Sequence, residues 1–246
     1  MSRVSIVMPS MNSRKYLERS IVAFLEQDYA NKRLIIVDGK STDGSHEIIK
    51  NFAQRNSQIA WIKYKDSGIS DAINHGLDII ENDEIFGFLG ADDIMLQGTI
   101  STVNRYLSEN PHSIGVFFDS ISQDSDGNQK SRQCPSPSMT MSNLLKHRTI
   151  AGAQNTFLKA YIAKRYKYDT SMKYAMDYEL YLRLAQDGFG EKIHHIPIPS
   201  TININDGNIS TTFRQASKSE AIDLAYKFSP RGWQKLKYGV KKLTGF

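Results

Sequence analysis

The sequence predicts an α/β fold with a mostly parallel, Rossmann-like sheet flanked by helices. Three observations support this prediction. Short apolar runs alternate with segments whose apolar residues recur at helical spacing throughout the first half of the chain. Most of the apolar runs end in a turn rich in glycine or aspartate. At 246 residues, the chain is long enough to form one large domain with a complete core.

The elements of the first half follow one another in a regular order. Continuous apolar runs predict strands, and apolar residues three or four positions apart predict the helices between them. Interleaving of this kind indicates βαβ units, in which parallel strands are joined through helices. The predicted strands cover residues 4–8, 34–37, 59–64, 85–89 and 114–118, and the predicted helices cover 16–25, 48–52, 69–80 and a segment ending near 109.

The second half is less regular. Residues 120–138 are polar, with a turn expected at 126–128 and with Pro135 and Pro137 as breakers. A strand is expected at 150–158, a helix at 176–186 and a further strand at 193–198. Because His194 and His195 are adjacent in that last strand, their side chains should face opposite ways, and we do not expect them to share a metal.

The charge and the cysteine content exclude some classes of function. The net charge is +5, but residues 227–246 carry six basic residues and no acidic one. The remaining 25 basic residues nearly balance the 26 acidic ones, so nucleic acid is not expected as a partner. Cys134 is the only cysteine, so the chain cannot form an internal disulfide. With no secretory signal or membrane-length apolar stretch in the sequence, we expect a cytoplasmic location.

Acidic residues follow several predicted strands. Asp38, Asp66, Asp92 and Asp93 each stand where a strand ends, so they should gather at one edge of the sheet. Converging carboxylates repel one another unless a cation joins them, and a hard divalent ion would also bridge a diphosphate. The alternative is structural: aspartate is a common turn former, and Asp93 could cap the following helix.

Five segments, taken in order, resemble motifs of family 2 glycosyltransferases with the GT-A fold. They extend over most of residues 4–184 and include the first strand, the second-strand turn, a glycine-containing motif, the acidic pair and a late acidic helix. A loop at 206–210 is also similar to one in this family. The five segments are residues 4–12, 35–45, 66–76, 87–93 and 175–184.

The resemblance implies a role for each matching residue. Pro9, Asn12 and Asp38 would shape the nucleotide pocket, and Asp66, Gly68 and Asp71 would line its nucleoside side. Asp92 would face the ribose and the metal, and Asp93 would ligate Mn²⁺ or Mg²⁺. Asp177 would take the proton from an acceptor hydroxyl. Many relatives carry a second acid, often reading the nucleobase, where this chain has Gly39.

A single displacement at the anomeric carbon would invert its configuration. Glu179 is a poor candidate for a second nucleophilic carboxylate, because two residues along a helix turn it about 200° away from Asp177. The structural alternative is that Asp177 caps its helix, with Arg183 solvated or in a salt bridge.

The expected organisation is a glycosyltransferase domain at 1–226 and a basic amphipathic tail at 227–246. Within the domain, residues 1–118 would bind the nucleotide-sugar, and 119–226 would hold the acceptor and the base. In the tail, Trp233, Leu236, Val240 and Leu243 form one apolar stripe beside lysines. Such a helix suits peripheral contact with an anionic inner-membrane surface. The alternative, to which the same stripe is equally well suited, is a last helix that packs on the core of the domain.

The function expected from the resemblance is a hexosyltransferase in cell-surface polysaccharide biosynthesis. It would move a sugar from a nucleotide-sugar, such as a UDP-sugar, to a hydroxyl of a glycan or lipid-linked acceptor. One alternative is a sugar nucleotidyltransferase, which should have a glycine-rich basic loop after the first strand, whereas residues 9–15 contain no glycine. The other is a non-catalytic, membrane-associated module that binds nucleotide-sugars.

Overall fold

The computed structural model describes residues 1–204 and 214–230, and its centre is one nine-stranded sheet. Its strand order is β3-β2-β1-β4-β8-β6-β9-β5, with β7 paired to β6. The expected loop at 206–210 and most of the expected tail lie outside the described residues. Within the described part of the chain, no helix combines the length and apolar character needed to cross a membrane.

The first half confirms the predicted βαβ pattern. The four strands β1 (Val4–Ser10), β2 (Lys32–Asp38), β3 (Ile59–Lys63) and β4 (Ile85–Phe88) are all parallel. Successive strands are connected through helices α1 (Arg14–Leu25), α2 (Ser45–Arg55) and α3 (Ile69–Asp78). The carboxyl ends of the four strands therefore meet at one edge of the sheet.

The second half adds antiparallel pairings. Strand β8 (Thr156–Lys159) is antiparallel to both β4 and β6 (Gly115–Gln123), whereas β9 (Ile193–Ile204) is parallel to β6. Two short strands, β5 (Ile94–Met95) and β7 (Gln129–Arg132), pair antiparallel with β9 and β6. The remaining helices are α4 (Thr99–Glu109), α5 (Met141–His147), α6 (Ala160–Tyr166), α7 (Met176–Gln186) and α9 (Arg214–Phe228).

One prediction for the second half was wrong in part. The strand expected at 150–158 begins only at Thr156, because Ala153–Asn155 form a 3-10 turn that leads into it. The polar segment 120–138, for which only a turn was expected, also contains the end of β6 and all of β7, whose four residues are exposed. An exposed strand lacks the apolar alternation on which a prediction from sequence depends.

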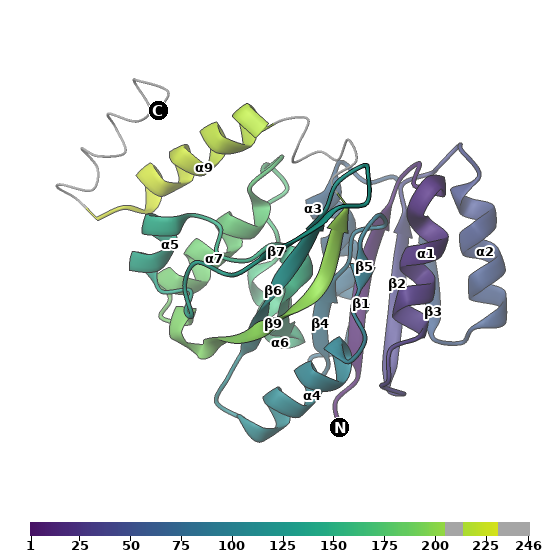
Figure 1. Cartoon of the computed structure of the whole chain (residues 1–246), viewed down its shortest axis with the longest axis horizontal. Coiled ribbons are helices and arrows are strands. Elements are labelled where there is room, and N and C mark those ends of the chain that lie inside the picture. The colour runs from purple at the N-terminus through teal and green to yellow at the C-terminus, as the bar shows by residue number, and fades with distance from the viewer. Residues whose placement is uncertain (205–213, 231–246) are drawn as a thin grey trace.

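The sheet separates two hydrophobic cores. Along β1, Ile6 and Met8 belong to the core beneath α1, α2 and α4, whereas Val7 belongs to the core beneath α3, α6 and α7. This alternation follows from the two-residue period of a strand and gives a three-layer molecule. Figure 1 shows α1 and α2 at one end of the sheet and α5, α7 and α9 together at the other.

Candidate active site

A cleft of about 630 Å³ opens at the carboxyl ends of β1 and β4. It lies at the sheet edge where the sequence predicted that acidic residues would gather. Five of the predicted site residues line the cleft: Pro9, Asn12, Asp92, Asp93 and Asp177. Strands from the first half and a helix from the second half thus build one concave site.

The acidic pair lies in a tight turn after β4. The Asp93 N–H donates to the Gly90 carbonyl at 3.1 Å. A Cβ atom on Gly90 would lie 2.8 Å from a carboxylate oxygen of Asp92 and 2.8 Å from one of Asp93. Both carboxylates therefore face the same small volume above Gly90, and a side chain at position 90 would compete with them for it.

This arrangement changes the acidity of both residues. Burial and, to a smaller extent, the Asp92 charge raise the pKa of Asp93 to about 8, while the Ile204 N–H and Arg19 act in the opposite direction. Burial also raises the pKa of Asp92, against the lowering effects of a backbone hydrogen bond and Arg19. Two carboxylates that resist ionisation together are typical of a site for a hard cation.

The donor set fits a divalent ion such as Mn²⁺ or Mg²⁺, which prefers carboxylate oxygens and would remove the repulsion within the pair. The alternative role for Asp93, capping the next helix, is wrong. Gly98, in the left-handed region at φ 78°, is the residue that precedes α4.

Helix α1 holds the acidic turn from one side. Arg19 donates from Nη2 to the Asp92 carbonyl at 3.2 Å, and the Ser20 hydroxyl donates to the Ala91 carbonyl at 2.9 Å. Arg19 is also the cation that lowers the pKa of both carboxylates. Arg19 was not predicted, because an arginine on an amphipathic helix carries no signal that distinguishes it from a solvated one.

Asp177 enters the cleft from the first turn of α7. Its Oδ1 accepts the N–H of Tyr178 at 2.7 Å, and the Ala153 N–H is a further backbone donor to its carboxylate. Burial raises the pKa of Asp177 to about 6, and these backbone bonds oppose the rise. A carboxylate with a pKa near neutrality, facing a cleft, can accept a proton from a substrate. Ala175, not Asp177, is the N-cap residue of α7.

Glu179 has a separate, structural role. It is buried, and its carboxylate binds the Arg183 side chain at 2.7 Å, one turn along α7. Arg183 in turn donates to the carbonyls of Tyr166 and Lys167, which fixes the end of α6. Of the two readings for Arg183, the salt bridge is therefore correct, and Glu179 does not line the cleft.

Asp38, one of the predicted nucleotide residues, lies beneath the rim and does not line the cleft itself. It is buried, and its Oδ1 accepts both the N–H and the hydroxyl of Ser41, at 3.1 and 2.7 Å. Ser41 then accepts the N–H of Asn12, whose own side chain accepts the Thr42 N–H at 2.9 Å. Asp38 thus helps to set the backbone that presents Asn12, which has a positive φ of 52°.

Asp66, Gly68 and Asp71 form the turn that begins α3, beside the cleft rather than in its lining. Asp66 accepts the Gly68 N–H at 3.1 Å, and Asp71 accepts the N–H and hydroxyl of Ser67. Gly68 has a φ of 138°, a conformation that favours glycine. A Cβ on Gly39 would lie 2.8 Å from Oδ2 of Asp66, so the Asp66 carboxylate lies next to the position at which many relatives carry their second acid.

Four polar residues that the second half of the chain contributes to the cleft lining were not predicted. Lys173 and Tyr174 directly precede the motif at 175–184, so their position next to it was a usable signal. Gln154 and Asn203 lie in segments with no such motif, and nothing in the sequence marks them. All four line the cleft together with Asp177.

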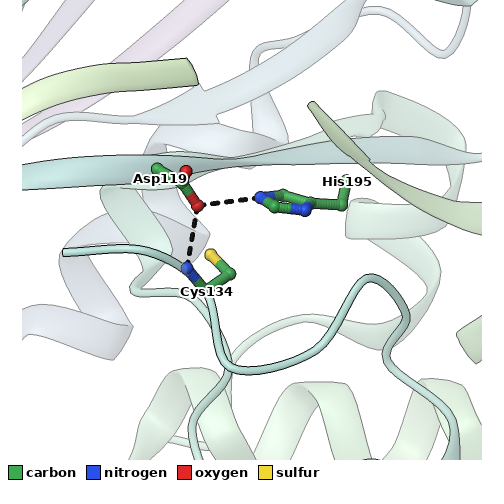
Figure 2. Close-up of side chains that lie close together, drawn as sticks. All are labelled: Asp119, Cys134 and His195. Carbon is green, nitrogen blue, oxygen red and sulfur yellow. Dashed lines mark hydrogen bonds and ion pairs between the residues drawn. The ribbon is translucent and has the colours of Figure 1, made fainter. Parts of the chain in front are cut away.

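Asp119, Cys134 and His195 form a second group of possible metal ligands, shown in Figure 2. Oδ1 of Asp119 accepts the Cys134 N–H and lies 2.8 Å from Nε2 of His195. The thiol donates to the Phe118 carbonyl, and burial raises its pKa to about 12. Hydrogen bonds already engage Oδ1 of Asp119, the thiol of Cys134 and Nε2 of His195, and they join β6, β9 and the segment after β7.

The two adjacent histidines face opposite sides of β9, as predicted. His195 stacks on Phe117 with ring centroids 5.0 Å apart, whereas His194 lies 5.9 Å from the ring of Tyr106 on α4. They therefore cannot bind one ion together.

The three-layer fold, with an acidic cleft at the carboxyl ends of its parallel strands, is that of the GT-A class. The profile of glycosyl transferase family 2 matches residues 5–167, and the chain belongs to this family. The minor teichoic acid biosynthesis protein GgaB of Bacillus subtilis is 33% identical over 115 residues, which are 46% of this chain and 13% of GgaB. An uncharacterized glycosyltransferase of Haemophilus influenzae is 32% identical over 130 residues, about half of each chain.

Solved structures share the fold at low identity. Residues 1–349 of S. aureus TarS, in complex with UDP-GlcNAc, match 98% of this chain and 71% of that one, with a TM-score of 0.71 and 15% identity. The mannosyltransferase PcManGT from Pyrobaculum calidifontis, in complex with GDP-Man and Mn²⁺, matches 98% and 69%, with a TM-score of 0.66 and 14% identity. The aligned region covers 13% of GgaB and 51% of the Haemophilus influenzae protein, so this chain corresponds to only part of the length of these relatives.

Proposed function

We propose that this chain is an inverting glycosyltransferase of the hexosyltransferase type. It transfers a sugar from a nucleotide-sugar to a hydroxyl of a glycan or lipid-linked acceptor. The observation that carries this proposal is that the Asp92–Asp93 pair and Asp177 line one cleft, although 84 residues separate Asp93 from Asp177. The pair fits a cation, and Asp177 is a carboxylate with a raised pKa that faces the same space.

In this mechanism, Asp93 would ligate the cation and Asp92 would face the ribose and the metal, so that the diphosphate end of the donor would be held through the ion. A bound divalent ion supplies charge neutralisation for the departing nucleoside diphosphate. Asp177 accepts the acceptor hydroxyl proton as the oxygen attacks the anomeric carbon from the side opposite the leaving group. One such displacement inverts the configuration at that carbon.

The choice of substrates rests on the relatives. A UDP-sugar is the donor that we propose, because TarS binds UDP-GlcNAc, although PcManGT binds GDP-Man. A Campylobacter jejuni relative, 29% identical over 112 residues, is named as a glucosyltransferase acting on an undecaprenol-linked glycan, and GgaB is named for teichoic acid biosynthesis. These names support a cell-surface polysaccharide pathway and a lipid-linked acceptor.

The proposed organisation follows the sequence analysis. Residues 1–118 supply the acidic pair and the nucleotide side of the cleft, 119–226 supply Asp177, and 227–246 form a basic tail. A cytoplasmic enzyme whose tail contacts the anionic inner face of the membrane would lie close to a lipid-linked acceptor. Of the tail, only residues 227–230 lie within the described residues.

A donor panel tests the proposal. We expect one nucleotide-sugar among UDP-, GDP-, ADP- and TDP-sugars to be hydrolysed slowly with water in the presence of Mn²⁺. The measurement is release of free nucleoside diphosphate, and we expect excess EDTA to suppress it because the departing diphosphate then lacks its counter-ion.

The rival functions give different results in the same assay. A sugar nucleotidyltransferase would release pyrophosphate from a nucleoside triphosphate and a sugar 1-phosphate. A binding module would bind nucleotide-sugars without turnover. Either outcome, with no nucleoside diphosphate released from any donor, would contradict the proposed function.

The rate should also depend on pH in a defined direction. Asp177 must be ionised to accept a proton, and its pKa is about 6. With saturating Mn²⁺, kcat/KM should therefore rise with pH through about 6 and reach a plateau above 7. The measurement is kcat/KM from initial rates at pH values between 5 and 9. A rate that is flat or falls between pH 5 and 7 would remove Asp177 from the role of base.

A further inference from the structure

The loop that leads into α7 has no cap of its own. The N-cap position of the helix is occupied by Ala175, whose methyl group cannot accept a hydrogen bond. Helix starts leave backbone N–H groups without partners, and serine, threonine, aspartate or asparagine usually satisfies them locally. Since Asp177 lies in the first turn of this helix, its position depends on how this start is held.

A carboxylate 45 residues further along the chain instead binds the backbone N–H groups at the N-cap residue and just before it. Glu220, on α9, accepts three consecutive N–H groups, from Lys173 at 3.1 Å, Tyr174 at 2.8 Å and Ala175 at 2.6 Å. Its negative charge at the amino end of α7 is also favourable with respect to the helix dipole. Glu220 therefore performs from a distance the function that a capping-box glutamate performs within one helix.

Glu220 is itself held firmly. The residues that follow it on α9, Ala221, Leu224 and Ala225, are buried in the core shared with α7. At the other end of the same loop, the Asn74 side chain of α3 pairs with the backbone of Tyr168 through two bonds of 2.8 Å. The segment that carries Lys173, Tyr174 and Asp177 into the cleft is thus fixed on two sides, by α3 and by α9.

We propose that Glu220 is a positioning residue that sets the place of Asp177 by clamping the 173–175 backbone against α9. The activity test of this inference rests on the proposed function. Glutamine at 220 keeps one acceptor oxygen, but its amide NH2 group replaces the other. The amide hydrogens would then face backbone N–H groups, which are also donors, so the substitution should release the clamp. Because Ala221, Leu224 and Ala225 still anchor α9, Glu220→Gln should remain folded.

The activity test compares Glu220→Gln with wild type and with Ser219→Ala, a matched control at an exposed neighbour on α9. We expect turnover to fall about 10²-fold in Glu220→Gln, the loss typical of a misplaced group, while UDP affinity by calorimetry stays within twofold. Ser219→Ala should match wild type. In the double variant with Asp177→Asn, turnover should be no lower than in Asp177→Asn alone, because the two residues act as one unit. Two outcomes would overturn the inference. One is a double variant whose loss of turnover is the product of the two single losses, and the other is turnover of Glu220→Gln within twofold of wild type.

Hydrogen exchange tests the clamp without any turnover. The amides of 173–175 should exchange faster in Glu220→Gln and in Glu220→Ala than in wild type, and at the wild-type rate in Ser219→Ala. If wild type hydrolyses no donor, the proposed function fails by itself, and this measurement still decides the clamp. Unchanged exchange at 173–175 in both Glu220 variants would contradict it.

Discussion

Replacing Asp177 by asparagine is expected to lower turnover by about 10²–10⁴-fold, the usual contribution of a general base. Asparagine keeps an oxygen that can accept the Tyr178 N–H, so the geometry of the first turn of α7 should persist. It cannot take a proton from an attacking hydroxyl. The measurement is the initial rate at pH 8 with Mn²⁺, where wild-type Asp177 is ionised.

The matched control is Asp187→Asn, the same chemical change at the exposed carboxyl end of the same helix. It should keep wild-type turnover. Stability should not explain the loss in Asp177→Asn, because burial already disfavours the charged form of this carboxyl. Turnover of Asp177→Asn within threefold of wild type would show that another group accepts the proton.

Replacing Asp93 by asparagine is expected to remove the response to Mn²⁺ and to lower turnover by at least about 10²-fold. The physical reason is that Asp93 is the more deeply buried carboxylate of the pair and the one with a pKa of about 8. A cation relieves this unfavourable charge in wild type, whereas the amide leaves no charge to relieve. Turnover and the thermal unfolding midpoint are both followed as Mn²⁺ is added.

The sign of the stability change without metal follows from the same pKa. Because the folded-state pKa of Asp93 lies above its ordinary value of 3.8, its ionisation costs stability progressively as pH rises from about 4 to about 8. At pH 8 without metal, Asp93→Asn should therefore unfold at a temperature no lower than wild type.

Asp83→Asn, at an exposed position preceding the amino end of β4, is the matched control and should keep the Mn²⁺ response. A full Mn²⁺ response in Asp93→Asn would place the metal elsewhere.

The fold could be predicted where apolar periodicity is uninterrupted. The helix expected at 176–186 has the same bounds in the structure, because its apolar residues leave no gap in the 3.6-residue pattern. Helices α5, α6 and α9 were not predicted. Helices α5 and α6 are only seven residues long, and α9 interrupts its few apolar residues with serine and lysine, so tertiary packing decides all three.

The candidate site could be predicted only in part. Turn chemistry and strand order identify Asp92 and Asp93, because carboxyl ends of parallel strands share an edge. Placing Asp177 in the same cleft needed the family resemblance, since no local pattern shows that residues 84 positions apart line one site. Arg19 and Glu220 act through backbone groups of distant loops, and such contacts depend on the folded arrangement of whole helices.

Gly39 and Asp66 lie next to each other although they follow two different strands, β2 and β3. A side chain at 39 would begin 2.8 Å from Oδ2 of Asp66, which is the free end of a flexible side chain. An acid at 39 would therefore require the Asp66 carboxylate to turn away and would add a like charge beside it. Positions 39 and 66 are consequently expected to be coupled, so that an acid introduced at 39 is better tolerated when residue 66 is neutral.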